Sequence, residues 1–124
     1  MTHSIRHEPI PAGQAIVVVG DADASAAAAL DEAVREAVRS VLAENLERLI
    51  IFDLSEANFL DSRTIGILLG WEDRLSVNAW RLPIVCSDPN LLRLFGVIGL
   101  DRKFEFFATR DEAVAPPSAG LTDP

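Results

Sequence analysis

An aspartate followed directly by a serine, Asp61-Ser62, is the pair of residues in this sequence best placed to do chemistry. The pair follows an apolar run at residues 49–54 and precedes a helix-like pattern from about residue 63 to residue 78. A helix that starts here offers unpaired N–H groups and the positive end of its dipole, which suit an N-cap and favour negative charge. Ser62 is therefore either a helix cap alone or a cap that also carries function.

Other arrangements that would indicate catalysis or cofactor binding are missing from the sequence. It contains no phosphate-binding loop, no dinucleotide fingerprint and no nucleophile elbow. No histidine lies within the predicted core to activate Ser62 as a nucleophile. His3 and His7 are four residues apart, but Pro9 and Pro11 argue against a helix that would bring both onto one metal ion. We expect no enzyme, no metal and no cofactor.

The composition predicts one folded, acidic domain. The 124 residues are 49% hydrophobic and carry a formal net charge of −8, which suits a single core and argues against binding of nucleic acid, because that needs clustered Lys and Arg. Cys86 is the only cysteine, so no internal disulfide is expected and the thiol is predicted to be buried and structural. No apolar run is long enough to span a bilayer, so we expect a cytoplasmic protein without direct membrane contact.

Apolar patterns along the chain predict four strands that alternate with four helices. The strands are expected at residues 14–19, 49–54, 81–86 and 104–107, and the helices at 25–45, at 63–78, after Asp88-Pro89 and after Thr109. Such an order indicates the α/β class, with a mainly parallel β-sheet packed by helices.

The segments outside these elements define the predicted boundaries of the domain. Residues 1–9 are expected to be an N-terminal tail, or alternatively an extended segment at the edge of the sheet. The domain is predicted to span residues 10–115, with a loop at residues 55–60 and a disordered C-terminal tail at residues 116–124.

Acidic and hydroxyl side chains follow the ends of the predicted parallel strands. Asp21 and Asp23 come after the first strand, and Asp61 comes after the second. Ligands and partners of such folds favour this edge of the sheet. Gly66 and Gly70 lie on one stripe of the second helix. Because each glycine costs about 1 kcal/mol relative to alanine inside a helix, we expect the sheet or another backbone to approach closely there.

Taken in order, these residues resemble the STAS domains, and within that family the small anti-sigma factor antagonists. The family has an apolar strand ending in Asp-Leu, here residues 50–54, and then Phe-x-Asp-Ser-(Ser/Thr)-Gly-(Leu/Ile)-Gly, here residues 59–66. Residues 20–23 are similar to its Gly-x-x-Asp, and residues 94–104 to its Leu-x-x-x-Gly-Leu-x-x-x-Phe. The resemblance covers about residues 10–115.

The resemblance implies a non-enzymatic, phosphorylation-switched protein-binding module. Ser62 would be the phosphoacceptor of a kinase-type anti-sigma factor, which the chain would sequester while Ser62 is unmodified. Arg63 and Thr64 depart from the family pattern, which usually has a small hydroxyl residue and a glycine there, and Thr64 offers a second candidate hydroxyl. The residues expected to bind the partner are Asp23, Asp61, Ser62, Arg63, Thr64 and Gly66.

Two alternatives remain open. One, within the same fold, is a STAS scaffold subunit of a lipid ABC-transporter complex. The other is a response-regulator receiver domain, in which Asp21 and Asp23 would hold Mg²⁺ and Asp53 would accept phosphate. Against the receiver, Asp53 precedes the last apolar residue of its strand, and the chain's only lysine, Lys103, lies next to Phe104.

Overall fold

The molecule is built on a five-stranded sheet, and its strands lie side by side in the order of the chain. The computed structural model describes residues 3–114. Its strands are β1 (His3–Ile10), β2 (Gly13–Ala22), β3 (Ile50–Leu60), β4 (Ile84–Val85) and β5 (Phe106–Phe107). Strand β1 is antiparallel to β2, whereas β2 to β5 are all parallel. The predicted α/β fold with a mainly parallel sheet is confirmed.

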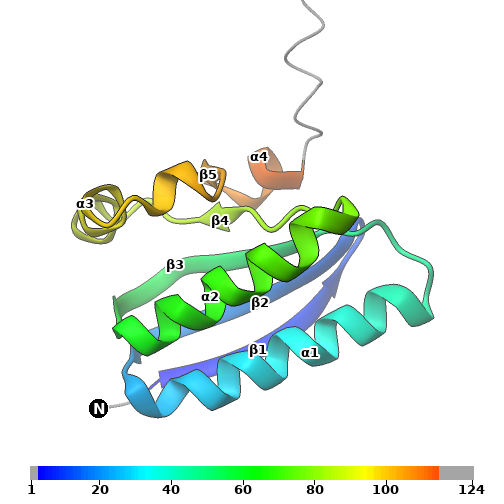
Figure 1. Cartoon of the computed structure of the whole chain (residues 1–124), viewed down its shortest axis with the longest axis horizontal. Coiled ribbons are helices and arrows are strands. Elements are labelled where there is room, and N and C mark those ends of the chain that lie inside the picture. The colour runs from blue at the N-terminus through cyan, green and yellow to red at the C-terminus, as the bar shows by residue number, and fades with distance from the viewer. Residues whose placement is uncertain (1–2, 115–124) are drawn as a thin grey trace, which may run out of the picture.

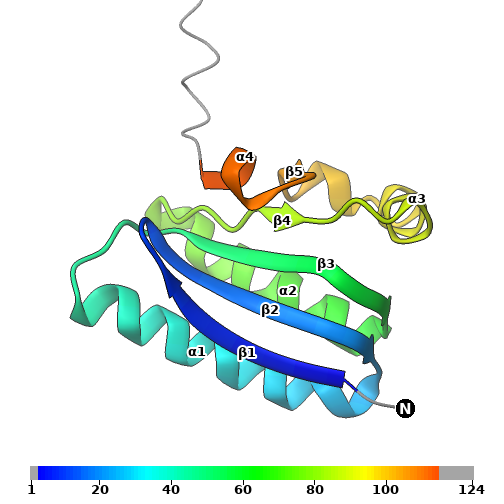
Figure 2. The same ribbon diagram turned by 180° about the vertical axis from the view of Figure 1, so that it is seen from behind.

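Two long helices cover one face of the sheet. They are α1 (Ala27–Ala43) and α2 (Ser62–Leu75), and they lie side by side across β1, β2 and β3 (Figure 1). Buried apolar side chains of both helices, such as Val34 and Leu68, pack with Ile16 and Phe52 of the sheet in the main core. Figure 2 shows the reverse face, where β1 and β2 lie in front of the helices. The helices predicted at residues 25–45 and 63–78 are therefore present with nearly the expected ends.

Two shorter helices follow later in the chain. Helix α3 (Pro89–Val97) comes after β4, and α4 (Arg110–Val114) comes after β5. Both have the caps that the sequence predicts: the Asp88 carboxylate accepts the N–H of Leu91 at 2.9 Å, and the Thr109 hydroxyl accepts the N–H of Glu112 at 3.3 Å. In both views α3 lies at the end of the molecule where β3 ends and α2 begins (Figures 1 and 2).

Strand β1 corrects the N-terminal tail predicted for residues 1–9. From His3 onward the segment pairs with β2, so it matches the alternative of an extended edge segment. Pro9 is tolerated because an edge strand leaves one row of N–H groups without a partner strand. The predicted C-terminal tail, residues 116–124, lies outside the described residues.

Strand β3 corrects the loop predicted at residues 55–60. Those residues continue the strand and pair with Val19–Ala22 of β2. The register between β2 and β3 shifts twice, because β3 has one extra residue opposite Val17–Val19 and another opposite Gly20–Asp21. Such bulges break the alternation of apolar and polar residues by which a strand is predicted. The last two strands are, by contrast, shorter than the runs predicted at residues 81–86 and 104–107.

An ionic cluster ties α4 to the strands. Asp53 is only 7% exposed, and its Oδ2 lies 2.7 Å from Nε of Arg110, whose Nη1 lies 2.8 Å from Oε2 of Glu8. The backbone N–H and hydroxyl of Ser55 both donate to Asp53 Oδ1, at 3.0 and 2.6 Å. Burial by itself raises the pKa of Asp53, but the hydrogen bonds from Ser55 and Arg110 outweigh it and hold that pKa below its ordinary value.

Candidate functional site at the start of helix α2

Asp61 is the N-cap of helix α2, and it holds the helix start against the sheet. Its Oδ1 accepts the N–H of Arg63 at 2.8 Å, and its own N–H donates to the carbonyl oxygen of Ala22 at 2.8 Å. The sequence allowed either Asp61 or Ser62 as the cap, and the structure assigns it to Asp61. Ser62 is the first helical residue; it is exposed, and within residues 3–114 its hydroxyl makes no hydrogen bond.

Asp23 adds a second carboxylate beside the helix start. Because Ala22 pairs with Leu60, Asp23 and Asp61 are the next residues past the ends of two neighbouring strands, which lie about 4.8 Å apart. The hydroxyl and the N–H of Ser25 donate to Asp23 Oδ1 at 2.6 and 3.0 Å. These hydrogen bonds lower the pKa of Asp23, so its carboxylate is ionised at neutral pH. The structure thus brings together two of the predicted acidic residues.

Thr64 lies under the surface of the site. Its side chain is fully buried, and its hydroxyl donates to the carbonyl oxygen of Ala22 at 3.2 Å, with the carbonyl oxygen of Asp23 at 3.4 Å. The residue therefore links α2 to the segment that carries Asp23. The Thr64 hydroxyl is therefore shielded from solvent, whereas Ser62 is exposed.

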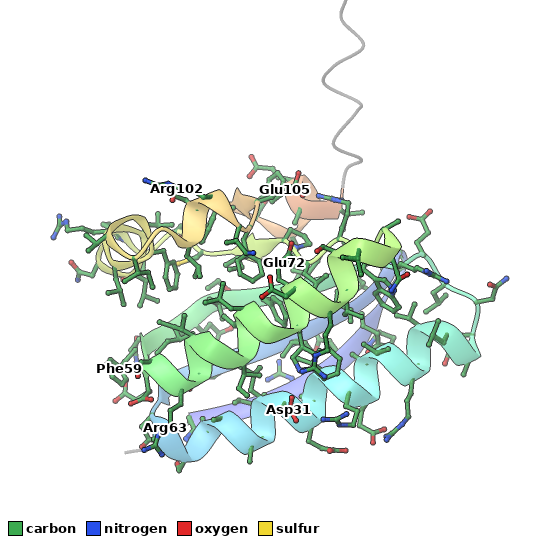
Figure 3. All side chains as sticks on the ribbon, viewed as in Figure 1. Asp31, Phe59, Arg63, Glu72, Arg102 and Glu105 are labelled. Atoms are coloured by element: carbon green, nitrogen blue, oxygen red, sulfur yellow. The ribbon has the colours of Figure 1, made fainter. Side chains whose placement is uncertain are left out.

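Arg63 and Gly66 complete the predicted set, and both are exposed. Figure 3 places Arg63 and Phe59 at the same end of the molecule. A Cβ built on Gly66 meets no atom within 4 Å, and one built on Gly70 meets only a terminal nitrogen of Arg74 at 3.9 Å. The close approach expected at these two glycines is therefore wrong for the described residues. The stripe faces outward and leaves bare helix backbone one turn after Ser62.

Replacing Gly66 by alanine should stabilise the fold. Alanine gains about 0.5–1 kcal/mol over glycine in a helix interior, and the open surface adds no clash. Urea unfolding should show this gain in the free energy of unfolding for Gly66→Ala and also for Gly70→Ala. Gly13→Ala is the opposite control, since its Cβ would lie 2.3 Å from the carbonyl oxygen of Leu49 and must destabilise. A loss of stability in Gly66→Ala would contradict the open stripe.

An apolar groove of about 320 Å³ lies beside Ser62, and no sequence motif predicted it. It is lined by Phe59, Leu60, Asp61, Ser62, Ile65, Leu94 and Ile98. The exposed fractions are 47% for Phe59, 36% for Leu94 and 47% for Ile98. The sequence of helix α3 contained an indication of this groove, because the helix carries apolar residues on more faces than its contact with the core requires.

The structure does not assemble the acidic site that a receiver domain would need. Asp53 of β3 pairs with Val17 of β2, whereas Asp21 of β2 pairs with Phe59. Asp21 therefore lies four residues beyond Val17, which is about 13 Å further along the strand at about 3.3 Å per residue. The Asp53 carboxylate is already bound by Arg110 and Ser55. Between residues 3 and 114, no three His, Cys, Asp or Glu side chains come together in a way that would hold a metal ion.

Two further expectations concern Cys86 and the membrane. Cys86 is buried, as predicted, and burial raises the pKa of its thiol, which disfavours the nucleophilic thiolate. Over the described part of the chain, no helix combines the length and the apolar character needed to cross a bilayer.

The fold defines a small α/β domain with a mainly parallel sheet and a candidate site on its surface. Its distinctive residues lie on an outer surface, where an exposed serine, two carboxylates and an apolar groove meet at the start of one helix. The chain belongs to the STAS domain family, whose model matches residues 15–113. The family predicted from the sequence is confirmed.

Solved structures with the same fold include anti-sigma factor antagonists. One from Mycobacterium paratuberculosis is 26% identical to this chain, with a TM-score of 0.73 over 91% of this chain and 92% of that one. The antagonist SpoIIAA in its unphosphorylated form is 19% identical, with a TM-score of 0.63 over 90% and 94%. Bacillus SpoIIAA in its phosphorylated form is 23% identical, with a TM-score of 0.60 over 90% and 96%. No curated protein matches the chain.

Proposed function

We propose that this chain is an anti-sigma factor antagonist that sequesters a kinase-type anti-sigma factor while Ser62 is unmodified. The observation that carries the proposal is the exposed Ser62 hydroxyl on the first turn of α2, beside the carboxylates of Asp23 and Asp61. The 26% identical antagonist from Mycobacterium paratuberculosis supports the general role. In this proposal the activity of the chain is binding. Its Ser62 is the substrate of the anti-sigma factor, which is itself the kinase.

The charges of the site favour a partner with basic side chains. The chain has a formal net charge of −8, and two carboxylates flank the exposed serine. Complementary charge speeds the encounter of two proteins and fixes their relative orientation. The bare backbone at Gly66 lets a partner approach the helix closely, and the buried Thr64 keeps the segment that carries Asp23 beside that helix.

Reversing the charge of Asp23 should weaken binding of the anti-sigma factor by about tenfold or more, because a lysine would face the basic partner with like charge. Gly66→Arg should have a similar effect by filling the open stripe. Both variants should be titrated by calorimetry against purified kinase-type anti-sigma factors of the same organism. Asp23→Asn keeps a capping side chain and tests the charge alone.

A matched control is Glu44→Lys, which makes the same charge change at an exposed position at the far end of α1. It should leave the affinity unchanged. If Asp23→Lys and Gly66→Arg also bind like the wild type while their circular dichroism shows a folded protein, the interface lies elsewhere. A wild-type chain that binds none of the anti-sigma factors but assembles with purified lipid-transporter subunits would favour the scaffold role.

A further inference from the structure

We infer that the groove beside Ser62 receives an apolar side chain of the anti-sigma factor and forms the hydrophobic centre of the interface; this inference rests on the proposed function. Strand β3 contributes Phe59, helix α2 contributes Ile65, and Leu94 and Ile98 come from α3 and its C-cap. Asp61 and Ser62 belong both to the groove and to the proposed interface. The groove therefore continues the same binding surface.

The exposed apolar residues of the groove are not needed by the core. Helix α3 already packs Leu91 and Phe95 inward, at 4% and 1% exposure. Leu94 and Ile98 stay in contact with solvent and line the same groove as the exposed Phe59. Contiguous apolar side chains on the surface of a soluble protein mark sites of interaction with another molecule. Large apolar side chains in such pockets are common centres of binding energy.

The charges select a protein partner with a basic group over a second copy of this chain. Among the described residues that line the groove, Asp61 is the one ionisable residue, so the complementary surface is apolar with a cation next to it. Two copies of this chain would each bring a net charge of −8 and the carboxylates of Asp23 and Asp61 to the contact. That like-charge contact is unfavourable, whereas a basic anti-sigma factor meets the acidic residues and the groove together.

The groove also gives a reason for the sensitivity of docking to the state of Ser62. An apolar side chain can enter only if the groove loses its water. A phosphate on Ser62 adds about −1.5 to −2 charges at pH 7 at the groove itself. Because a charge that loses its water without gaining a partner is strongly unfavourable, modification would block the apolar contact as well as the ionic ones.

Two neighbouring residues provide a matched test. Ile98 lines the groove, whereas Val97 is 79% exposed and does not line it. Replacing Ile98 by asparagine should weaken binding of the anti-sigma factor by roughly 10- to 100-fold. Val97→Asn should change the affinity by less than about threefold, in the range of ordinary surface substitutions. Leu94→Asn should behave like Ile98→Asn, with calorimetric titration and circular dichroism for each protein.

The outcomes separate this inference from the proposed function. If Ile98→Asn, Leu94→Asn and Val97→Asn all bind the anti-sigma factor as strongly as the wild type does, the inference about the groove is overturned. The antagonist role is unaffected by that result. A wild-type chain that binds no anti-sigma factor overturns both. Sedimentation of the chain alone should show a monomer; a dimer that Ile98→Asn dissociates would make a second copy the occupant and would also overturn the inference.

Discussion

Phosphorylation of Ser62 is expected to weaken binding of the anti-sigma factor by roughly 100-fold or more, with little change in the backbone. The phosphate adds about −1.5 to −2 charges at pH 7 on a surface that already holds the carboxylates of Asp23 and Asp61. A like-charge contact or an unpaired charge in a desolvated interface costs several kcal/mol. The fold itself should persist, because the N-terminus of α2 favours a negative group.

The measurement is made with the protein, a kinase-type anti-sigma factor and ATP. Mass spectrometry should locate one phosphate on Ser62, and titration of both forms should give the difference in affinity. Ser62→Ala should resist modification and still bind, and Ser62→Asp should bind weakly. Thr64→Val is the matched control: it removes the buried hydroxyl at nearly constant volume, and modification should continue at Ser62.

Two results would contradict this switch. A phosphate that persists in Ser62→Ala but disappears in Thr64→Val would move the acceptor to Thr64, against its burial in the structure. Equal affinity of the modified and unmodified proteins would leave the STAS fold unaffected but would exclude phosphorylation as the control of binding.

Removing the Arg110 guanidinium is expected to lower the free energy of unfolding by about 2–4 kcal/mol at pH 7. Breaking a buried ion pair from one side costs about 3–5 kcal/mol, and the cost is smaller here because the Arg110 side chain is 31% exposed and solvent screens it. In Arg110→Met the Asp53 carboxylate would stay buried with only Ser55 as a donor. Glu8 would lose its contact with Arg110 as well.

The pH dependence tests the cause. The pKa of Asp53 is lowered in the folded state, so its stabilising effect is present above the unfolded pKa, about 3.9, and is lost as the pH falls through the folded value. The deficit of Arg110→Met should therefore be large at pH 7 and shrink below about pH 4. Urea unfolding at several pH values measures this deficit.

Two further variants complete that experiment. Asp53→Asn/Arg110→Met should recover part of the lost stability, because no buried charge remains. Arg39→Met, which breaks the exposed pair with Glu36, should stay within about 0.5 kcal/mol of the wild type. A loss in Arg110→Met that is equally large at pH 7 and at pH 3 would show that packing, and not the ion pair, holds α4.

Local features of the sequence determined much of the fold and the centre of the site. The N-caps at Asp61, Asp88 and Thr109 depend on residues two or three positions apart, so they can be predicted without knowledge of the rest of the chain. The apolar stripes of α1 and α2 repeat with the period of a helix for the same reason. The resemblance carried by residues 59–66 also pointed to Ser62 and to the STAS family.

Other features were decided only by contacts between distant segments. The strand at residues 55–60 exists because β2 pairs with it through two shifts of register, which obscure the alternating pattern. Arg110 reaches Glu8 across 102 positions of the chain and Asp53 across 57. The buried Thr64 donates its hydroxyl to the carbonyl oxygen of Ala22, which lies 42 positions earlier in the chain.

The surface of the site depended most on the tertiary structure. Gly66 faces open solvent, and the groove exists because α3 brings Leu94 and Ile98 to the end of β3, where Phe59 stays exposed. A helix period shows which residues share a face, but which face is covered depends on the neighbouring elements. The positions of those neighbouring elements depend on the burial of the whole apolar core, to which residues far apart in the chain contribute.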